Sequence, residues 1–184
     1  MKVTELAMPG LKLLATRRFG DERGWFAEVW QEQRYREAGI AESFVQDNLA
    51  MSAKGVLRGL HAQEPHAQGK LVQVFEGRVF DVAVDLRVGS PTFAQWHGVV
   101  LDEDNALQFY VPPGFLHGYY VMSERALFGY KTTDIYSPES ELSVRWDDPD
   151  IGIDWPLDGE PTLSNKDRSA PLLAEISESR MSRF

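Results

Sequence analysis

Cysteine is absent from the 184-residue sequence, which excludes disulfide bonds, thiolate catalysis and cysteine-ligated metal sites. Positive charge is scarce, because the sequence has 19 lysines and arginines but 28 aspartates and glutamates, which gives a net charge of -9. Nucleic acid and anionic membranes are therefore unfavoured partners, although a few local cations still permit a small anionic ligand. No apolar run approaches the roughly 20 residues of a membrane span, and residues 1–10 lack an apolar signal core. We therefore expect a cytoplasmic protein.

The amino-acid composition is that of an ordinary globular protein, with 43% hydrophobic and 26% charged residues. Short runs rich in β-branched and aromatic residues recur between turns that contain glycine and proline. These runs cover residues 71–75, 79–86, 93–101, 108–111, 118–122 and 126–133. The regular spacing predicts an antiparallel β-sandwich or barrel, not βαβ units. Without a repeat or linker, we expect one domain over residues 1–184.

The amino-terminal third adds three local predictions. Glycines bracket a charged turn within residues 19–26, which predicts two short strands joined by a loop. Residues 31–38 lack β-branched side chains and stop before Gly39, which predicts a short helix with a glycine cap. Residues 44–51 read as a strand, and one of its faces is unusually polar for a core. We expect that face to line a wet cavity.

The run of residues 55–63 contains an arginine and a histidine, and a lysine follows at the start of the next apolar run. Arg58 can hold an anion, His61 can transfer a proton near neutral pH, and Lys70 carries a positive charge. An anion-binding group, a base and a cation suit proton abstraction beside a carbonyl. The alternative is that His61 is a structural histidine with satisfied hydrogen bonds.

A second histidine follows a backbone restricted by prolines and glycine, in residues 111–118. The spacing Pro-x-Gly-x-x-His that ends at His117 matches half of the cupin signature, a jelly-roll pattern in which this histidine can be a metal ligand. The other half requires His-x-His, but Gln63 stands two residues after His61, and glutamine is a poor ligand for transition metals. We therefore expect no metal. The alternative is a metal-dependent cupin that uses His61, His66 and His117.

Two further residues have both a structural and a catalytic interpretation. Tyr130 is either a buried tyrosine with a satisfied hydroxyl or a proton donor whose pKa a nearby cation lowers. Asp167 stands three residues after Ser164, which is capping-box spacing and predicts a helix start. Alternatively, its carboxylate orients His61 as in a His–Asp dyad. Residue spacing leaves both pairs of alternatives open.

Motifs along the whole sequence resemble, in order, those of the dTDP-4-dehydrorhamnose 3,5-epimerase family. They are residues 55–61 (GVLRGLH), 69–72 (GKLV), 80–87 (FDVAVDLR), 89–93 (GSPTF), 113–118 (PGFLHG), 130–134 (YKTTD), 146–149 (WDDP) and 163–167 (LSNKD). The resemblance implies a homodimeric cupin jelly roll that needs no metal or cofactor. It further implies conversion of dTDP-4-dehydro-6-deoxy-D-glucose to dTDP-4-dehydro-L-rhamnose by epimerisation at carbons 3 and 5, in dTDP-L-rhamnose biosynthesis.

The resemblance also implies residue roles. His61 is the base with Asp167 as its partner, Tyr130 is the acid, and Lys70 lies beside the carbonyl oxygen. The implied substrate-binding residues are Phe19, Arg23, Glu28, Gln46, Asn48, Arg58, His117 and Tyr136. Some of the first three are implied to reach the substrate across the dimer interface.

The sequence also departs from the family pattern. Ala62 and Gly129 stand where larger residues are usual, and we expect both to affect the shape of the pocket. Some relatives invert one carbon only, so a mono-epimerase of a related dTDP-4-keto-deoxysugar is an alternative function. A non-catalytic cupin that binds sugar nucleotides is another.

Overall fold

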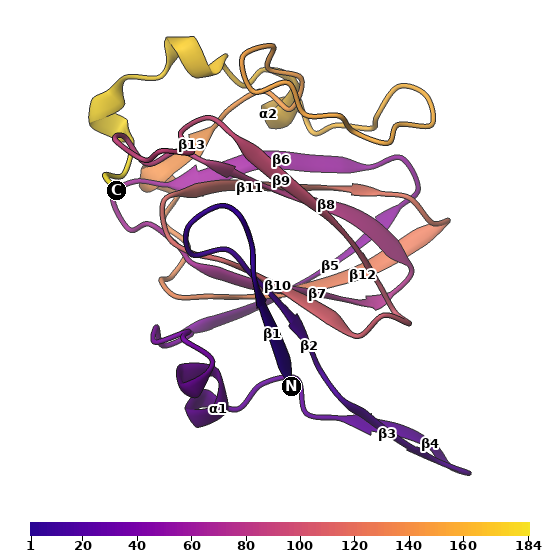
Figure 1. Cartoon of the computed structure of the whole chain (residues 1–184). Helices are drawn as coiled ribbons and strands as arrows, with labels where there is room; N and C mark the ends of the chain where they lie inside the picture. The colour runs from indigo at the N-terminus through magenta and orange to yellow at the C-terminus, as the bar shows by residue number, and fades with distance from the viewer.

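Two antiparallel sheets stack on each other in the structure, a computed structural model that describes residues 1–184 (Figure 1). The six-stranded sheet has the order β1 (Lys2–Glu5), β2 (Lys12–Ala15), β10 (Leu107–Val111), β7 (Lys70–Glu76), β12 (Arg125–Thr132) and β5 (Gln46–Ala53). The five-stranded sheet has the order β13 (Glu141–Ser143), β6 (Leu57–Gln63), β11 (Phe115–Val121), β8 (Arg78–Asp85) and β9 (Trp96–Asp102). The predicted antiparallel β-sandwich of cupin type is confirmed.

Strand β8 is buried on both faces, and its side chains alternate between two cores. Val79 and Ala83 belong to the core between the two sheets. Val82 and Val84 belong to a second core on the other side of the five-stranded sheet. The carboxy-terminal segment, orange to yellow in Figure 1, covers that side and contributes Trp155 and other apolar residues. A strand with two buried faces favours apolar side chains on both of them, and residues 79–86 are apolar except for Asp81 and Asp85.

Helices are few and short. The predicted helix is confirmed as α1 (Glu32–Glu37), and Gly39 follows its end with φ +80, the left-handed geometry of a glycine cap. The others are α2 (Asn165–Arg168) and the 3-10 turns η1 (Pro138–Ser140), η2 (Leu173–Glu175) and η3 (Glu178–Arg180). None of these helices has the length and apolar character required to cross a bilayer.

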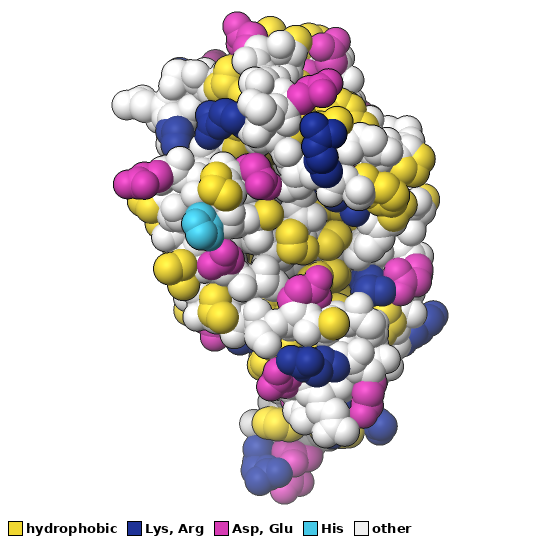
Figure 2. Space-filling model, turned by 90° about the vertical axis from the view of Figure 1, so that its left-hand side faces the viewer, with side chains coloured by type: hydrophobic (Ala, Val, Ile, Leu, Met, Phe, Trp, Pro, Cys, Tyr) yellow, Lys and Arg dark blue, Asp and Glu magenta, His cyan; other side chains and the backbone are white.

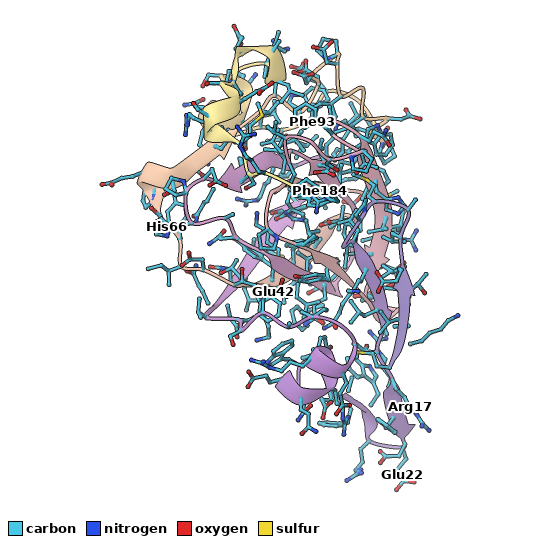
Figure 3. All side chains as sticks on the ribbon, turned by 60° about the vertical axis from the view of Figure 1, so that its left-hand side comes forward. Arg17, Glu22, Glu42, His66, Phe93 and Phe184 are labelled. Atoms are coloured by element: carbon cyan, nitrogen blue, oxygen red, sulfur yellow. The ribbon has the colours of Figure 1, made fainter.

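The two predicted amino-terminal strands form a hairpin that projects from the body of the molecule. Strands β3 (Arg18–Asp21) and β4 (Gly24–Ala27) pair only with each other. Figure 3 shows Arg17 at the base of this hairpin and Glu22 at its tip, away from both sheets. The side chains of Trp25 and Phe26 are more than half exposed there. The hairpin thus presents apolar surface that no other element of this chain covers.

Candidate active site

A cavity of about 450 Å³ lies where β6, β7, β11, β12 and residues 162–167 meet. Seven of the predicted site residues line it, namely Arg58, His61, Lys70, His117, Tyr130, Tyr136 and Asp167. They come from β6, β7, β11, β12, the loop after β12 and α2, so only the tertiary structure brings these side chains together.

The imidazole of His61 and the carboxylate of Asp167 form a pair in the cavity wall. Nε2 of His61 lies 2.5 Å from Oδ1 of Asp167, and the carboxylate side chain is 4% exposed. Burial raises the pKa of Asp167, but hydrogen bonds from His61 and Ser164 outweigh it and hold that pKa below its ordinary value. An ionised carboxylate can only accept hydrogen bonds, so Nε2 carries the proton and Nδ1 keeps its lone pair. This tautomer is the form that can act as a base.

Asp167 makes contacts that fit both interpretations of its sequence context. Ser164 is the N-cap of α2, and its Oγ accepts a hydrogen bond of 3.1 Å from the backbone N–H of Asp167. The carboxylate of the same aspartate contacts His61. The helix cap and the His–Asp pair therefore coexist in one turn of chain.

Lys70 is a buried cation close to this pair. It starts β7, and its Nζ lies 3.5 Å from the carbonyl oxygen of His61. Burial lowers the pKa of Lys70 to about 8, and the negative charge of Asp81 opposes that shift. Near neutral pH the side chain is therefore mostly an ammonium group in a shielded environment, where its field acts more strongly than in water.

Asp81 was not singled out from the sequence as a site residue. It is fully buried on β8 and accepts hydrogen bonds from Nε2 of His117 at 2.9 and 3.0 Å. Burial raises the pKa of Asp81, while His117 and Lys70 oppose that shift. The available signal was a carboxylate inside the apolar run 79–86, because a charge buried in a sheet requires a partner.

Tyr130 reaches the cavity from β12. Its hydroxyl is not hydrogen-bonded within the chain, and no fully buried polar atom lacks a partner, so this hydroxyl is accessible. One interpretation of the sequence made Tyr130 a proton donor whose pKa a nearby cation lowers. The structure differs, because burial raises that pKa and outweighs the opposing charges of Arg58 and Lys166. The phenol therefore stays protonated at neutral pH, as a proton donor requires.

Arg58 supplies positive charge to the cavity. Its Nε donates a hydrogen bond of 3.1 Å to Oγ of Ser52, which lies 3.4 Å from the hydroxyl of Tyr119. The remaining guanidinium N–H groups of this exposed side chain have no acceptor within the chain. Ser52 and Tyr119 are buried, so they hold one edge of the guanidinium and leave the other free for an anion.

The sequence analysis also missed other polar groups of the cavity wall. Lys166 and Glu141 line it and form an ion pair of 2.5 Å, and Gln63 and Gln68 line it as well. Lys166 lies inside a matched motif, which was a usable signal, whereas nothing in the sequence around Glu141 marked it. Glu141 is placed there by the pairing of β13 with β6, a contact between strands that are far apart in the chain.

Gln46 and Asn48 lie beside the cavity. On β5 the amide of Gln46 donates a 2.8 Å hydrogen bond to Asn48. Both line a smaller adjoining cavity of about 270 Å³, which shares Gln68, Tyr130 and Tyr136 with the larger one. The expectation that this polar strand face borders a cavity agrees with the structure.

Three predicted binding residues do not reach the cavity of their own chain. Phe19 and Arg23 lie on the projecting hairpin, and Arg23 pairs with Asp21. Glu28 follows the hairpin and pairs with Arg34 at 2.7 Å. Figure 2 shows the hairpin below the body, with acidic and basic side chains interspersed over this face.

The three histidines of the metal-dependent alternative do not converge on one point. His66 lies at the edge of the body (Figure 3), does not line the cavity, and has Nδ1 3.3 Å from Asp134. His61 and His117 each use Nε2 to contact a carboxylate. No group of three His, Cys, Asp or Glu side chains is arranged to hold a metal ion.

The two departures from the family pattern differ in their position. Ala62 lines the cavity, as expected. Gly129 faces away from it, because a Cβ added there would meet the ring of Phe75, 2.4 Å away, on the outer side of the six-stranded sheet. The expectation that Gly129 shapes this pocket was therefore wrong.

Comparison with known proteins agrees with this geometry. A family model described as dTDP-4-dehydrorhamnose 3,5-epimerase matches residues 5–175. The dTDP-4-dehydrorhamnose 3,5-epimerase of Pseudomonas aeruginosa is 53% identical over 176 residues, which cover 95% of this chain and 97% of that protein. A crystal structure of dTDP-6-deoxy-D-glucose-3,5-epimerase from Legionella pneumophila, in complex with dTDP-4-keto-L-rhamnose, matches with a TM-score of 0.97. It is 51% identical and the match covers 100% of this chain and 98% of that one.

A more distant structure is also similar. The 3'-monoepimerase of Streptomyces bikiniensis, in complex with dTDP-quinovose, matches with a TM-score of 0.86 and 35% identity. The match covers 92% of this chain and 86% of that one. Both the extent of the family match and the identity to the Pseudomonas protein lead to one conclusion. The chain belongs to the dTDP-4-dehydrorhamnose 3,5-epimerase family.

Proposed function

We propose that this enzyme converts dTDP-4-dehydro-6-deoxy-D-glucose to dTDP-4-dehydro-L-rhamnose by epimerisation at carbons 3 and 5. The observation that carries the proposal is a single cavity lined by the His61–Asp167 pair, the ammonium of Lys70 and the phenol of Tyr130. The substrate class is supported by family membership and by the similar Legionella structure in complex with dTDP-4-keto-L-rhamnose.

The first chemical step is proton abstraction beside the ketone. A C–H bond next to a carbonyl is acidic because the electron pair that remains becomes an enolate, with its charge on the carbonyl oxygen. Nδ1 of His61 takes the proton, and the buried anion of Asp167 stabilises the imidazolium that forms. Lys70 stabilises the enolate oxygen by its positive charge in a shielded environment.

The second step returns a proton to the opposite face of the sugar ring. Tyr130 donates its phenolic proton to the carbon, the enolate electron pair forms the new C–H bond, and the ketone is restored. Burial keeps the pKa of Tyr130 raised, so the phenol has a proton to give at neutral pH. Exchange with solvent then resets both residues. A positioned acid or base contributes roughly 10²–10⁴-fold each to such a reaction.

Substrate binding is assigned to the polar groups around these residues. The free guanidinium edge of Arg58 binds pyrophosphate or sugar oxygens, which offsets the net charge of -9 locally. His117, Tyr136, Gln46 and Asn48 provide the remaining polar wall. This chemistry uses only side chains of the protein, without a metal or cofactor.

We propose a homodimer in which the hairpin of one subunit reaches the active site of the other. Phe19, Trp25 and Phe26 on the hairpin are exposed, and so are Leu49 and Phe75 on the outer side of the six-stranded sheet. Apolar surface of this extent is typical of an interface. The arrangement gives Phe19, Arg23 and Glu28 a role that they lack within their own chain. Sedimentation analysis tests it, since a monomer at micromolar concentration would contradict the dimer.

Solvent deuterium tests the reaction itself. In D₂O, double epimerisation incorporates one deuterium at carbon 3 and one at carbon 5 of the sugar. A single deuterium would indicate a mono-epimerase, a second candidate that the similar 3'-monoepimerase of Streptomyces bikiniensis favours. A substrate without deuterium would indicate a non-catalytic binding protein. Dependence of turnover on a stoichiometric metal would contradict the proposed chemistry.

A cytoplasmic location stays a prediction from the sequence.

A further inference from the structure

Both oxygens of the Asp167 carboxylate are engaged. Oδ1 lies 2.5 Å from Nε2 of His61, and Oδ2 accepts a hydrogen bond of 2.7 Å from the hydroxyl of Ser164. The same Ser164 Oγ accepts the backbone N–H of Asp167 at 3.1 Å. The carboxylate therefore cannot turn about its Cβ–Cγ bond without losing one of these contacts.

A helix cap accounts for only half of this arrangement. An N-cap side chain accepts a backbone N–H, and serine, threonine, asparagine and aspartate all do so. The hydrogen bond that Ser164 donates to Oδ2 is not part of capping, and an aspartate at this position could not make it. It gives a second donor to a carboxylate that is 4% exposed, where an unpartnered oxygen would be unfavourable.

We propose that Ser164 is a positioning residue for proton abstraction. Its hydroxyl fixes the Asp167 carboxylate so that Oδ1 holds Nε2 of His61 and Nδ1 is presented to the substrate. This role rests on the proposed function, in which His61 is the base. Ser164 acts through Asp167 and His61 and needs no contact with the reacting atoms.

Removing the serine hydroxyl removes none of the charged groups around Asp167. His61 faces the carboxylate from β6, and Lys166 of α2 adds a positive charge. Lys166 is paired in turn with Glu141 of β13. A change in the pH dependence of kcat in a Ser164 variant therefore reports on the hydrogen bond that the serine hydroxyl donates to Oδ2 of Asp167.

Steady-state kinetics over a range of pH, on purified full-length variants, separate positioning from capping. Ser164→Ala removes both hydrogen bonds, Ser164→Asp keeps the capping acceptor but removes the donor, and Ser164→Thr keeps both. Ser169→Ala is the matched control, because the Ser169 hydroxyl at the other end of α2 bonds only backbone carbonyls. His61→Ala serves as the reference for loss of the base.

We expect Ser164→Ala and Ser164→Asp to lose roughly ten- to a hundredfold in kcat, with KM little changed. Ser164→Thr should restore most of that loss, and Ser169→Ala should match the wild type. The acid limb of the kcat profile of Ser164→Ala should move to higher pH, because the carboxyl group loses a donor that favours its ionised form.

Turnover of Ser164→Asp at the wild-type rate would contradict the positioning role, since capping alone would then explain the serine. Wild-type kcat and pH dependence in Ser164→Ala would contradict it as well. Should Ser164→Asp fail to fold, the pH profiles of the other variants decide, because the acid limb should move in Ser164→Ala and not in Ser164→Thr, whereas loss of a helix cap alone would leave it in place. Failure of the proposed function gives a different result, because His61→Ala would then retain turnover itself.

Discussion

The imidazole of His61 contacts the carboxylate of Asp167 across 2.5 Å, although 106 residues separate them in the sequence. Strand β6 holds the imidazole between β11 and β13, and α2 holds the carboxylate. A buried anion at this distance stabilises a positive imidazolium, so the pair favours the product of proton abstraction. The predictions below test this pair and the groups around it.

His61→Ala and Tyr130→Phe should each lower kcat by roughly 10²–10⁴-fold, because each removes one proton-transfer group. His61 belongs to no core cluster, and Tyr130 packs against one only as a partly buried residue. Circular dichroism should therefore show an intact fold. His66→Ala is the control, since His66 lies outside the cavity. Near-full activity of either of the first two variants would show that the assigned role is wrong.

Activity and the Lys70 contribution to stability should change in opposite directions at alkaline pH. Burial lowers the pKa of Lys70 to about 8, so kcat/KM should fall as the pH rises through about 8 and the ammonium is lost. Between about pH 8 and the ordinary lysine pKa, the unfolded chain binds this proton and the folded chain does not. The free energy of unfolding therefore gains from Lys70 as the pH rises through that window.

Lys70→Met is the variant that measures this coupling. It should abolish turnover while leaving the protein at least as stable at pH 7, because an apolar side chain replaces a buried charge. Urea unfolding of the wild type and of Lys70→Met should show that the difference in their free energies of unfolding, in favour of the methionine variant, shrinks above about pH 8. A flat kcat/KM profile up to pH 10 would contradict the assigned role of the ammonium.

Ser52→Ala should weaken substrate binding by releasing the guanidinium of Arg58. Loss of one hydrogen bond to a charged group is worth about 1.5 kcal/mol, which corresponds to about a tenfold rise in KM. Ser90→Ala is the matched control, because Ser90 is also buried but donates to Asp85, away from the cavity. An equal effect of both variants on KM would argue against a specific role for Ser52.

Gly118→Ala should destabilise the protein and disturb the site together. A Cβ at Gly118 would lie 2.8 Å from the carbonyl oxygen of Arg58 and 3.2 Å from Cα of Gly59, so β6 and β11 must move apart. Overpacking of this kind costs about 1–3 kcal/mol in the free energy of unfolding, which urea titration measures. Gly20→Ala should be nearly neutral, because its Cβ would meet nothing closer than 3.6 Å.

Local patterns predicted the secondary structure well, because short-range geometry determines it. The helix at residues 31–38 followed from composition and a glycine stop, and the helix start at Ser164 followed from capping-box spacing. The largely apolar run at 79–86 predicted a strand, and burial on both faces explains its apolar residues. Asp81 was missed because its partner, His117, lies on a neighbouring strand that sequence periodicity cannot identify.

The sequence by itself determined which reactive groups are available, that cysteine chemistry is excluded, and that the chain forms an antiparallel β-sandwich. Only the tertiary structure decided that Asp167 both lies in the first turn of a helix capped by Ser164 and contacts His61, that His66 stands apart, and that Gly129 faces outward. The physical reason is that β6, β7, β11 and β12 are joined by pairings between strands distant in the chain. Such pairings set which side chains meet, and no local pattern encodes them.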